Sequence, residues 1–294
     1  MSTKAVDSNN EIDILLVGAG VMSATLAAML KELDSNLRIA LVERLPNIAG
    51  ESSDGWNNAG TGHAGYCELN YTPQDAKGSI NIQRALSINA AFEVSLQFWS
   101  YLVENNILKA DDFIRATPHL SFVWGKDNVE FLKKRQAALS QHPLFEDMQF
   151  SEDAATLTQW MPLIMENRNT NEAAAATKVD YGTDVDFGAL TRQLVTHLNT
   201  QQNFDLLLNH NVTRLKQDKR GIWHVGIRDK VNKKSRTIKA NFVFLGAGGA
   251  ALPLLQKSGI PEAKGYGGFP VSGMWLVCKN EDVIQKHHAK VYGK

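Results

Sequence analysis

The sequence predicts a mixed α/β fold in which a Rossmann-like unit is interrupted by a second, α+β domain. Two apolar stretches, residues 12–17 and 37–43, flank a glycine turn and a run of helix formers at 21–33, which is the pattern of a βαβ unit. Far downstream, "FVFLGAGGAA" at 242–251 repeats the order of a strand followed by glycines. We therefore expect one sheet to be built from segments on both sides of an insertion.

The composition is that of an ordinary globular protein and excludes several classes. The chain has 294 residues, 44% hydrophobic and 21% charged, with 31 basic residues balancing 31 acidic ones. A neutral chain has no overall field to attract nucleic acid, so no nucleic-acid partner is expected. Cys67 and Cys278 are too few and too far apart for a disulfide scaffold or a cysteine-rich metal site. No apolar stretch approaches the ~20 residues that cross a bilayer, so no membrane span is expected.

Hydrophobic periodicity predicts further elements along the chain. We expect a long helix at 82–105 and a helix that Asp186 caps at its start. The other predicted helices lie at 126–141 and 152–160, and the other predicted strands at 119–125, 205–209, 212–217, 222–228, 237–245 and 270–278. The segment after residue 160, rich in Ala, Asn and Thr, is predicted to be a loop.

The turn at Gly18 and Gly20 is the first candidate binding site. Gly18 allows a tight turn, Gly20 lets the backbone approach a pyrophosphate, and Ser23 is small enough for close helix–strand packing. The N-terminus of the following helix offers free N–H groups and a positive dipole end to phosphates. Glu43 ends the second predicted strand, where a carboxylate can bond ribose hydroxyls. Together these features predict a bound dinucleotide.

Two features favour FAD over NAD as that dinucleotide. The segment 46–80 carries six glycines and is far longer than the usual connection of about 4–6 residues, and an NAD-type unit needs no such loop. The predicted strand at 237–245 would return the chain to the same sheet, so that Gly246 and Gly248 pass the same dinucleotide again. The alternative, an NAD-dependent dehydrogenase, would bind NADH and be colourless.

Three stretches then make the chain recognisable: "SSDGWNNAGTGHAGYCELNYTP" (52–73), "GTDVDFGALTRQL" (182–194) and "GFPVSGMWL" (268–276). Together they resemble the malate:quinone oxidoreductase family. The resemblance implies an FAD-binding fold of the glutathione-reductase and amino-acid-oxidase type, with an inserted α+β substrate domain. It implies a bacterial flavoprotein of the tricarboxylic acid cycle that oxidises (S)-malate to oxaloacetate and passes electrons to membrane quinone. It also implies a cytoplasmic enzyme in peripheral contact with the inner face of the cell membrane.

The glycine turn and the resemblance together nominate the residues that hold FAD. They are Gly18, Ala19, Gly20, Val21, Met22 and Ser23 in the turn, Glu43 and Arg44 after the second strand, Ser52, Ser53, Asn57, Asn58, Gly60, Thr61 and Gly62 in the long loop, and Val212, Gly246, Ala247 and Gly248 downstream. Asn57, Asn58 and Thr61 are expected to bond ring or ribityl oxygens. Val212 lies where related flavoproteins lay a backbone strand against the adenine; the alternative is an ordinary core valine.

His63 is the only histidine in the long loop and the candidate catalytic base. Oxidising a 2-hydroxy acid requires a base for the hydroxyl proton, a hydride acceptor and cations for the carboxylates. An imidazole titrates near neutral pH and suits the first task. Two alternatives remain open: His63 packs against the flavin, or the base lies beyond Lys294. The arginines available for the carboxylates are Arg84, Arg115, Arg168 and Arg192, and nothing in the sequence selects among them.

Other features have ordinary explanations. The stripe Phe92–Leu96–Trp99–Val103 is expected to pack on the core, with a membrane or quinone surface as the alternative. "RDKVNKKSR" at 228–236 is expected to be a solvated hairpin tip, with contact to anionic lipid as the alternative. His287 and His288 are adjacent and form a poor metal pair, and no other cluster has ligand spacing, so no metal is predicted.

The resemblance also suggests a division into domains. Residues 11–80 and 181–265 would form the FAD-binding domain, and 81–180 and 266–294 the substrate domain. The last segment, "VIQKHHAKVYGK", carries no capping element, so we expect the protein to continue beyond Lys294. Two alternatives to malate oxidation stay open: an FAD-dependent oxidase or dehydrogenase of another 2-hydroxy acid or amino acid, and a fragment that binds the cofactor without turnover.

Overall fold

A computed structural model describes residues 11–169, 171–269, 271 and 273–293. The chain folds into two compact units, which we describe separately. Unit 1 comprises residues 1–59, 105–113 and 186–272, and unit 2 comprises residues 60–104, 114–185 and 273–294. The assignment of cofactor and substrate domains stays a prediction, because compactness does not show what each unit binds.

The strands are β1 Ile12–Val17, β2 Ile39–Val42, β3 Ile114–Ala116, β4 His119–Trp124, β5 Gln149–Ser151, β6 Ala174–Val179, β7 Thr183–Val185, β8 Phe204–Leu207, β9 His210–Gln217, β10 Trp223–Asp229, β11 Ser235–Leu245 and β12 Lys290–Gly293. The helices are α1 Val21–Leu33, α2 Gln83–Glu104, α3 Lys126–Leu139, α4 Ala154–Trp160, α5 Pro162–Met165, α6 Phe187–Leu198, α7 Ala251–Ser258 and α8 Glu281–Ile284. Most of the predicted elements are present, with ends shifted by a few residues.

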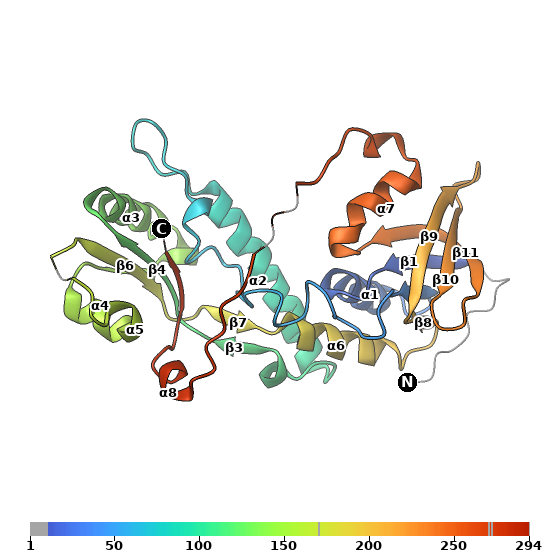
Figure 1. The fold of residues 1–294 in the computed structure, drawn as a ribbon, viewed down its shortest axis with the longest axis horizontal. Coiled ribbons are helices and arrows are strands. Elements are labelled where there is room, and N and C mark those ends of the chain that lie inside the picture. The colour runs from blue at the N-terminus through green and yellow to red at the C-terminus, as the bar shows by residue number, and fades with distance from the viewer. Residues whose placement is uncertain (1–10, 170, 270, 272, 294) are drawn as a thin grey trace. The chain divides into compact units, whose positions relative to one another are not determined.

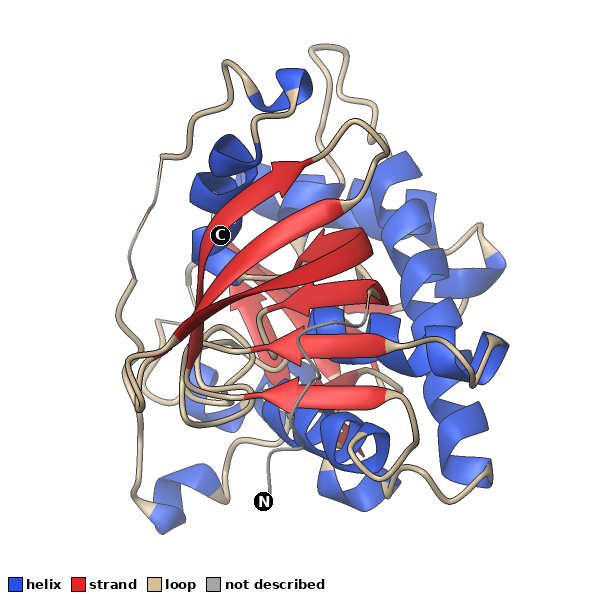
Figure 2. Ribbon diagram, turned by 90° about the vertical axis from the view of Figure 1, so that its right-hand side faces the viewer, coloured by secondary structure: helices blue, strands red, loops and turns tan. Residues whose placement is uncertain are grey.

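Unit 1 is built on a six-stranded sheet in the order β8-β2-β1-β11-β10-β9. Figure 1 labels β8, β1, β11, β10 and β9 of this sheet, and Figure 2 shows the strands in red. β8, β2, β1 and β11 run parallel, and β10 and β9 continue the sheet in antiparallel pairing. The predicted return of the chain to the first sheet is therefore confirmed: β11 lies beside β1, with Val17 opposite Leu245. The strand order reverses at β1, which has β2 on one side and β11 on the other.

Alternating side chains of the parallel strands explain how this sheet is buried on both faces. Leu15 and Val17 of β1 belong to a core cluster with Val225 and Ile227 of β10. The other face is covered by α1 and α6, which pack together. The carboxylate of Asp186 accepts the backbone N–H of Ala189, so the predicted N-cap of α6 is confirmed.

Unit 2 is built on a four-stranded sheet in the order β12-β4-β6-β5, with a separate two-stranded ladder of β3 and β7. β12 runs parallel to β4, and β4, β6 and β5 are antiparallel. Of the predicted apolar stripe on the long helix α2, Trp99 is buried and Phe92 packs against a core cluster, while Leu96 and Val103 are half-buried. The predicted packing of the stripe is therefore confirmed for part of it. Arg135 of α3 is fully buried in this unit.

Two predictions of secondary structure were wrong. The predicted strand at 270–278 is absent from the described part of that segment, where Met274 and Leu276 are 96% and 99% exposed. Pro270 and Ser272 lie outside the described residues. An apolar run becomes a strand only beside another strand, and no described strand pairs with this segment. Conversely, Ala174–Val179 is strand β6 where a loop was predicted, because pairing with β4 overrides the weak strand propensity of alanine.

Candidate functional site

The glycine turn of unit 1 lies where two parallel strands end side by side. Gly18 follows β1 and Gly246 follows β11, and a Cβ added to Gly18 would lie 2.6 Å from the carbonyl oxygen of Gly246 and 2.9 Å from Cα of Ala247. Gly18 has φ +96°, which L side chains rarely adopt. Backbone contact and backbone conformation both require glycine here. In open α/β sheets, ligands bind at such a point, where the strand order reverses.

The next residues begin α1 with an unusual cap. Gly20 is the N-cap residue of α1 and provides no capping side chain. Instead, the Oγ of Ser53 accepts the backbone N–H of Val21 at 2.9 Å. Ser23 is fully buried, and a Cβ on Gly246 would overlap its Oγ, so the small residues at both positions allow α1 to approach the end of β11. The remaining first-turn N–H groups have no acceptor within a helix, which is the property that phosphates use.

Glu43 is fixed at the end of β2 by two backbone donors. Its Oε2 accepts the N–H of Ala19 at 2.7 Å, and its Oε1 accepts the N–H of Leu45 at 2.8 Å. Each carboxylate oxygen has a second lone pair, so Glu43 can still accept a hydrogen bond from a hydroxyl group. The neighbouring Arg44 pairs with Glu51 at 2.6 Å and is exposed. Sequence spacing therefore predicted correctly that Glu43 lies beside the turn.

The asparagines of the long loop stabilise the loop itself. Nδ2 of Asn57 donates to the carbonyl oxygen of Glu51, and Nδ2 of Asn58 donates to those of Ser52 and Asp54. These bonds satisfy carbonyl oxygens of the loop, because a turn of this length leaves carbonyls that need donors. The bonds from Asn57 and Asn58 to ring or ribityl oxygens of a cofactor stay a prediction.

Three other predicted cofactor residues belong to unit 1. Met22 is 64% exposed at the start of α1. Val212 is 6% exposed in β9 and belongs to the core cluster of the sheet. This agrees with the alternative interpretation of Val212 as an ordinary core valine. Gly248 has φ +51° in the short turn that precedes α7, close to the Oγ of Ser52.

In unit 2, Gly60, Thr61 and Gly62 run beside β7. Gly60 accepts the N–H of Val185 at 2.7 Å, and the N–H of Gly62 donates to Thr183 at 3.0 Å. Thr61 is 1% exposed, and its hydroxyl lies 2.9 Å from that of Tyr292 in β12. A Cβ on Gly62 would overlap Thr183 and Phe92, so no other residue fits there without displacement. These contacts fix the backbone that leads into His63.

His63 forms a pair with Glu68. Its Nδ1 lies 2.9 Å from Oε1 of Glu68, and the imidazole side chain is 54% exposed while the carboxylate side chain is 5% exposed. Burial acts to raise the pKa of Glu68, but hydrogen bonds from His63 and from the backbone outweigh it, so the pKa of Glu68 falls below its usual value. A carboxylate at Nδ1 favours the tautomer with the proton on Nδ1, which leaves Nε2 as the basic nitrogen.

The loop that carries this pair is held by a buried guanidinium. Arg135 is fully buried; its Nη2 donates to the carbonyl oxygens of Gly65 and Tyr66 at 3.1 and 3.0 Å, and its Nε donates to Oγ1 of Thr72 at 2.9 Å. Burial lowers the pKa of Arg135 to about 10, so the group still carries its charge at neutral pH. Asn89 adds a further bond from α2, donating at 2.8 Å to the carbonyl oxygen of Ala64.

More polar groups of unit 2 gather near the loop. His119 is 1% exposed, its Nε2 lies 3.0 Å from the carbonyl oxygen of Thr183, and burial lowers its pKa. Its Nδ1 and Oε2 of Glu68 are buried and have no partner among the described residues. Lys290 pairs with Asp184 at 2.8 Å. Local sequence patterns did not predict that these side chains lie close together, because the residues come from three separate strands, β4, β7 and β12.

The four candidate arginines lie in different surroundings. Arg168 is over the rings of Phe122 and Trp124 and pairs with Glu172 at 3.2 Å. The others are Arg84 over the ring of Tyr71, Arg115 in β3 and Arg192, 3.9 Å from Asp186. Among the described residues, no three His, Cys, Asp or Glu side chains are placed to hold a metal.

Comparison with known proteins places the chain in a family. The family model described as "Malate:quinone oxidoreductase (Mqo)" matches residues 10–294. The chain belongs to the malate:quinone oxidoreductase family. It is 62% identical over 283 residues to a "Probable malate:quinone oxidoreductase" of Hahella chejuensis and 64% identical over 288 residues to one of Methylobacillus flagellatus. These matches cover 96% and 98% of the chain but 57% and 58% of the relatives, so the chain spans little more than half of their length.

Solved structures show the fold of this family member. The chain is similar to glycine oxidase from Geobacillus kaustophilus with a TM-score of 0.62 and 14% identity, covering 85% of the chain and 59% of that protein. It is similar to the FAD-bound L-α-glycerophosphate oxidase from Mycoplasma pneumoniae with a TM-score of 0.57 and 19% identity, covering 80% and 53%. At these identities the likeness shows the fold alone, and it confirms the Rossmann-like class predicted from the sequence.

Proposed function

We propose that the protein containing this chain oxidises (S)-malate to oxaloacetate with FAD as its cofactor and a membrane quinone as the electron acceptor. The observation that carries the proposal is the family match over residues 10–294, which agrees with the turn at Gly18 and Gly246. The relatives named for this reaction extend well beyond the length matched here. The activity is therefore proposed for the whole protein.

The residues of unit 1 fit FAD. The turn at Gly18 and the first-turn N–H groups of α1 suit a pyrophosphate, and Glu43 stands fixed beside them to accept ribose hydroxyls. The other predicted residues, from Ser52 to Gly62 and at Gly246 to Gly248, remain proposals for the same cofactor. When bound, FAD supplies the acceptor for the hydride that leaves C2 of malate.

The residues of unit 2 fit the removal of the hydroxyl proton. We assign that proton to Nε2 of His63, because Glu68 occupies Nδ1 and stabilises the imidazolium that forms. Malate loses one proton and one hydride, which together are two electrons and two protons, and a quinone that accepts them becomes a quinol. Arg135 acts as a positioning residue, since it holds the loop and not the substrate.

The remaining parts of the proposal concern location and domain roles. Within the described residues, every helix is too short or too polar to cross a bilayer. Quinone lies in the lipid phase, so we propose peripheral contact with the inner face of the bacterial cell membrane. Unit 1 would hold FAD and unit 2 would contribute the base, which adapts the division expected from the sequence.

Steady-state turnover tests the proposal. The purified protein, loaded with FAD, is given (S)-malate and a short-chain ubiquinone analogue, and oxaloacetate and quinol are measured. We expect equal amounts of both products and no NADH when NAD is supplied instead. Formation of NADH, or turnover with 2-hydroxyglutarate or an amino acid but not with (S)-malate, would contradict the proposal.

A further inference from the structure

One segment of this neutral protein is strongly basic. The three antiparallel strands β9–β11 and their turns, residues 209–240, contain ten lysines and arginines but only two acidic residues, Asp218 and Asp229. The segment thus has a net formal charge of +8, and the rest of the chain has a net charge of −8. A polyanion that approaches the chain is therefore attracted to this segment and repelled elsewhere.

The two aspartates offset only two of the ten cations, and Asp218 pairs with Arg220 of its own turn at 3.6 Å. Both carboxylates also accept hydrogen bonds within the turns. Oδ1 of Asp229 accepts the N–H groups of Val231 and Asn232, and Oδ1 of Asp218 accepts those of Arg220 and Ile222. These hydrogen bonds shape the two hairpin turns. Of the two acids, Asp218 also bonds Nε2 of His224, at 3.1 Å.

Strand register gathers the cations on one face. Val225, Ile227 and Ile238 point into the core, so the alternate residues point away from it. On that outer face, His224 lies opposite Lys216 on one side and Lys239 on the other. The next row holds Arg214 and Thr237 across Gly226, and the row after it holds Asn211 and Ser235 across Arg228. Arg214, Lys216, Arg228 and Lys239 are all exposed.

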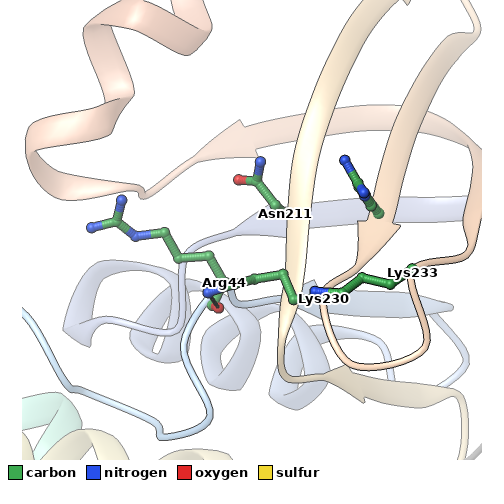
Figure 3. A pocket seen from close by; sticks show the side chains of 5 residues that line it. Arg44, Asn211, Lys230 and Lys233 are labelled. Carbon is green, nitrogen blue, oxygen red and sulfur yellow. Dashed lines mark hydrogen bonds between the residues drawn. The ribbon is translucent and has the colours of Figure 1, made fainter.

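The cations of this face lie in successive rows and not directly opposite one another, so together they form a positive surface that attracts anions. The face also contains two open hollows. One, of about 290 Å³, is lined by Arg214, Lys216 and Thr237 together with Gln217, Asp218, His224 and Gly226. The other, of about 460 Å³, lies toward the hairpin turn, where Arg44, Asn211, Lys230 and Lys233 surround it with Arg228 (Figure 3).

The hairpin turn ends in an apolar side chain among lysines. Val231 is 67% exposed and lies in sequence between Lys230 and the pair Lys233–Lys234. An apolar group flanked by cations suits the boundary between headgroups and acyl chains of a bilayer. Rows of exposed cations over three strands fit an extended anionic surface better than one small anion, which two or three of them would satisfy. Single-stranded nucleic acid requires several stacking aromatics, whereas the outer-face residues named above include one aromatic ring, His224, which bonds Asp218.

We propose that the outer face of β9–β11 is the surface with which the protein docks onto the anionic headgroups of a membrane. This inference rests on the membrane contact in the proposed function and names the residues that make it. Docking does not involve the turn at Gly18 or the pair His63–Glu68.

Vesicle co-sedimentation of the FAD-loaded protein, without malate, tests this inference. The vesicles are phosphatidylcholine alone or phosphatidylcholine with phosphatidylglycerol. One variant combines Arg214→Gln, Lys216→Gln and Lys239→Gln. The matched control combines Lys77→Gln, Lys126→Gln and Lys133→Gln, which remove the same charge from exposed positions in unit 2.

We expect binding only to the vesicles that contain phosphatidylglycerol, with loss of binding at high salt. Removing three cations from the face should weaken that binding about a hundredfold, roughly fivefold per cation, while the control keeps it. Equal loss in both variants, equal binding to neutral vesicles, displacement by inorganic phosphate at constant ionic strength, or tighter binding to a DNA duplex would overturn the inference. Malate-dependent turnover is measured separately, so vesicle binding without turnover contradicts only the proposed function.

Discussion

Nδ1 of His63 and Oε1 of Glu68 lie 2.9 Å apart in one loop of unit 2, with the imidazole exposed and the carboxylate buried. A buried carboxylate at one ring nitrogen orients the ring and makes the other nitrogen a better base. The pair is five residues apart in sequence, so the loop itself must bend to form it. This geometry supports the proposed role of His63 as the base, and the turn at Gly18 is the proposed site of FAD.

Glu68→Gln should slow the reduction of bound FAD by (S)-malate about 100-fold, because the amide neither stabilises an imidazolium nor fixes the tautomer. Stopped-flow absorbance measures this rate. The rate is also measured as a function of pH. Glu130→Gln, an exposed change on α3, is the control. An unchanged rate with an unchanged pH profile in Glu68→Gln would show that the pair has only a structural role.

The same carboxylate predicts a pH dependence of stability. The pKa of Glu68 lies below its ordinary value of 4.5 in the folded protein, so ionised Glu68 stabilises the fold above that pH. This stabilisation is lost as the pH falls through the lower, folded pKa. Thermal melts of the native protein and of Glu68→Gln should therefore differ most above the ordinary pKa of 4.5 and converge as the pH falls through the lower, folded pKa. A difference that is constant over this range contradicts the prediction.

Gly18→Ala should abolish FAD binding and lower the free energy of unfolding by roughly 2–5 kcal/mol. A conformation unfavourable to L residues costs ~1–2 kcal/mol, and overpacking against Gly246 and Ala247 costs ~1–3 kcal/mol. Gly259→Ala is a matched control, because Gly259 also has positive φ but nothing lies within 4 Å of its added Cβ. Denaturant melts and FAD titration measure both effects. Equal effects of the two substitutions would show that the close approach at Gly18 is unimportant.

Ser53→Ala should lower the free energy of unfolding by about 1 kcal/mol, since it removes the acceptor of the Val21 N–H at the start of α1. Denaturant melts measure the change, with Ser52→Ala as the neighbouring control. If Ser52→Ala costs as much as Ser53→Ala, the hydrogen bond does not cap the helix.

Arg135→Met should destabilise the protein by roughly 2–5 kcal/mol, because each buried acceptor left without a donor costs ~1–3 kcal/mol. The carbonyl oxygens of Gly65 and Tyr66 are the acceptors concerned. Lys133→Met, an exposed change on the same helix, should cost little. Thermal and denaturant melts compare the two. Equal stability of the variants would mean that Arg135 does not support the loop.

Local sequence patterns predicted the parts of the fold that depend on local chemistry. Gly18, Glu43 and the cap at Asp186 follow from turns, strand ends and helix starts, which a few adjacent residues specify. The parallel pairing of β1 and β11 was also predictable, because both strands end in glycine turns.

Other parts depend on contacts between distant segments. Arg135 looks like one more basic residue of a charged helix, and only the tertiary structure shows that it is buried beneath the loop. Glu68 and His119 carried no motif of their own; a histidine followed five residues later by an acid was the one available signal. Ala174–Val179 was predicted to be a loop because its local sequence has weak strand propensity. Its pairing with the distant strand β4 makes it a strand.

The measurement that tests the central claim most directly is an anaerobic visible spectrum of the FAD-loaded protein before and after addition of (S)-malate. The account predicts flavin bands that bleach with (S)-malate, and that bleach far more slowly in Glu68→Gln. A protein that takes up no FAD, or flavin bands that 2-hydroxyglutarate or an amino acid bleaches while (S)-malate does not, would contradict it.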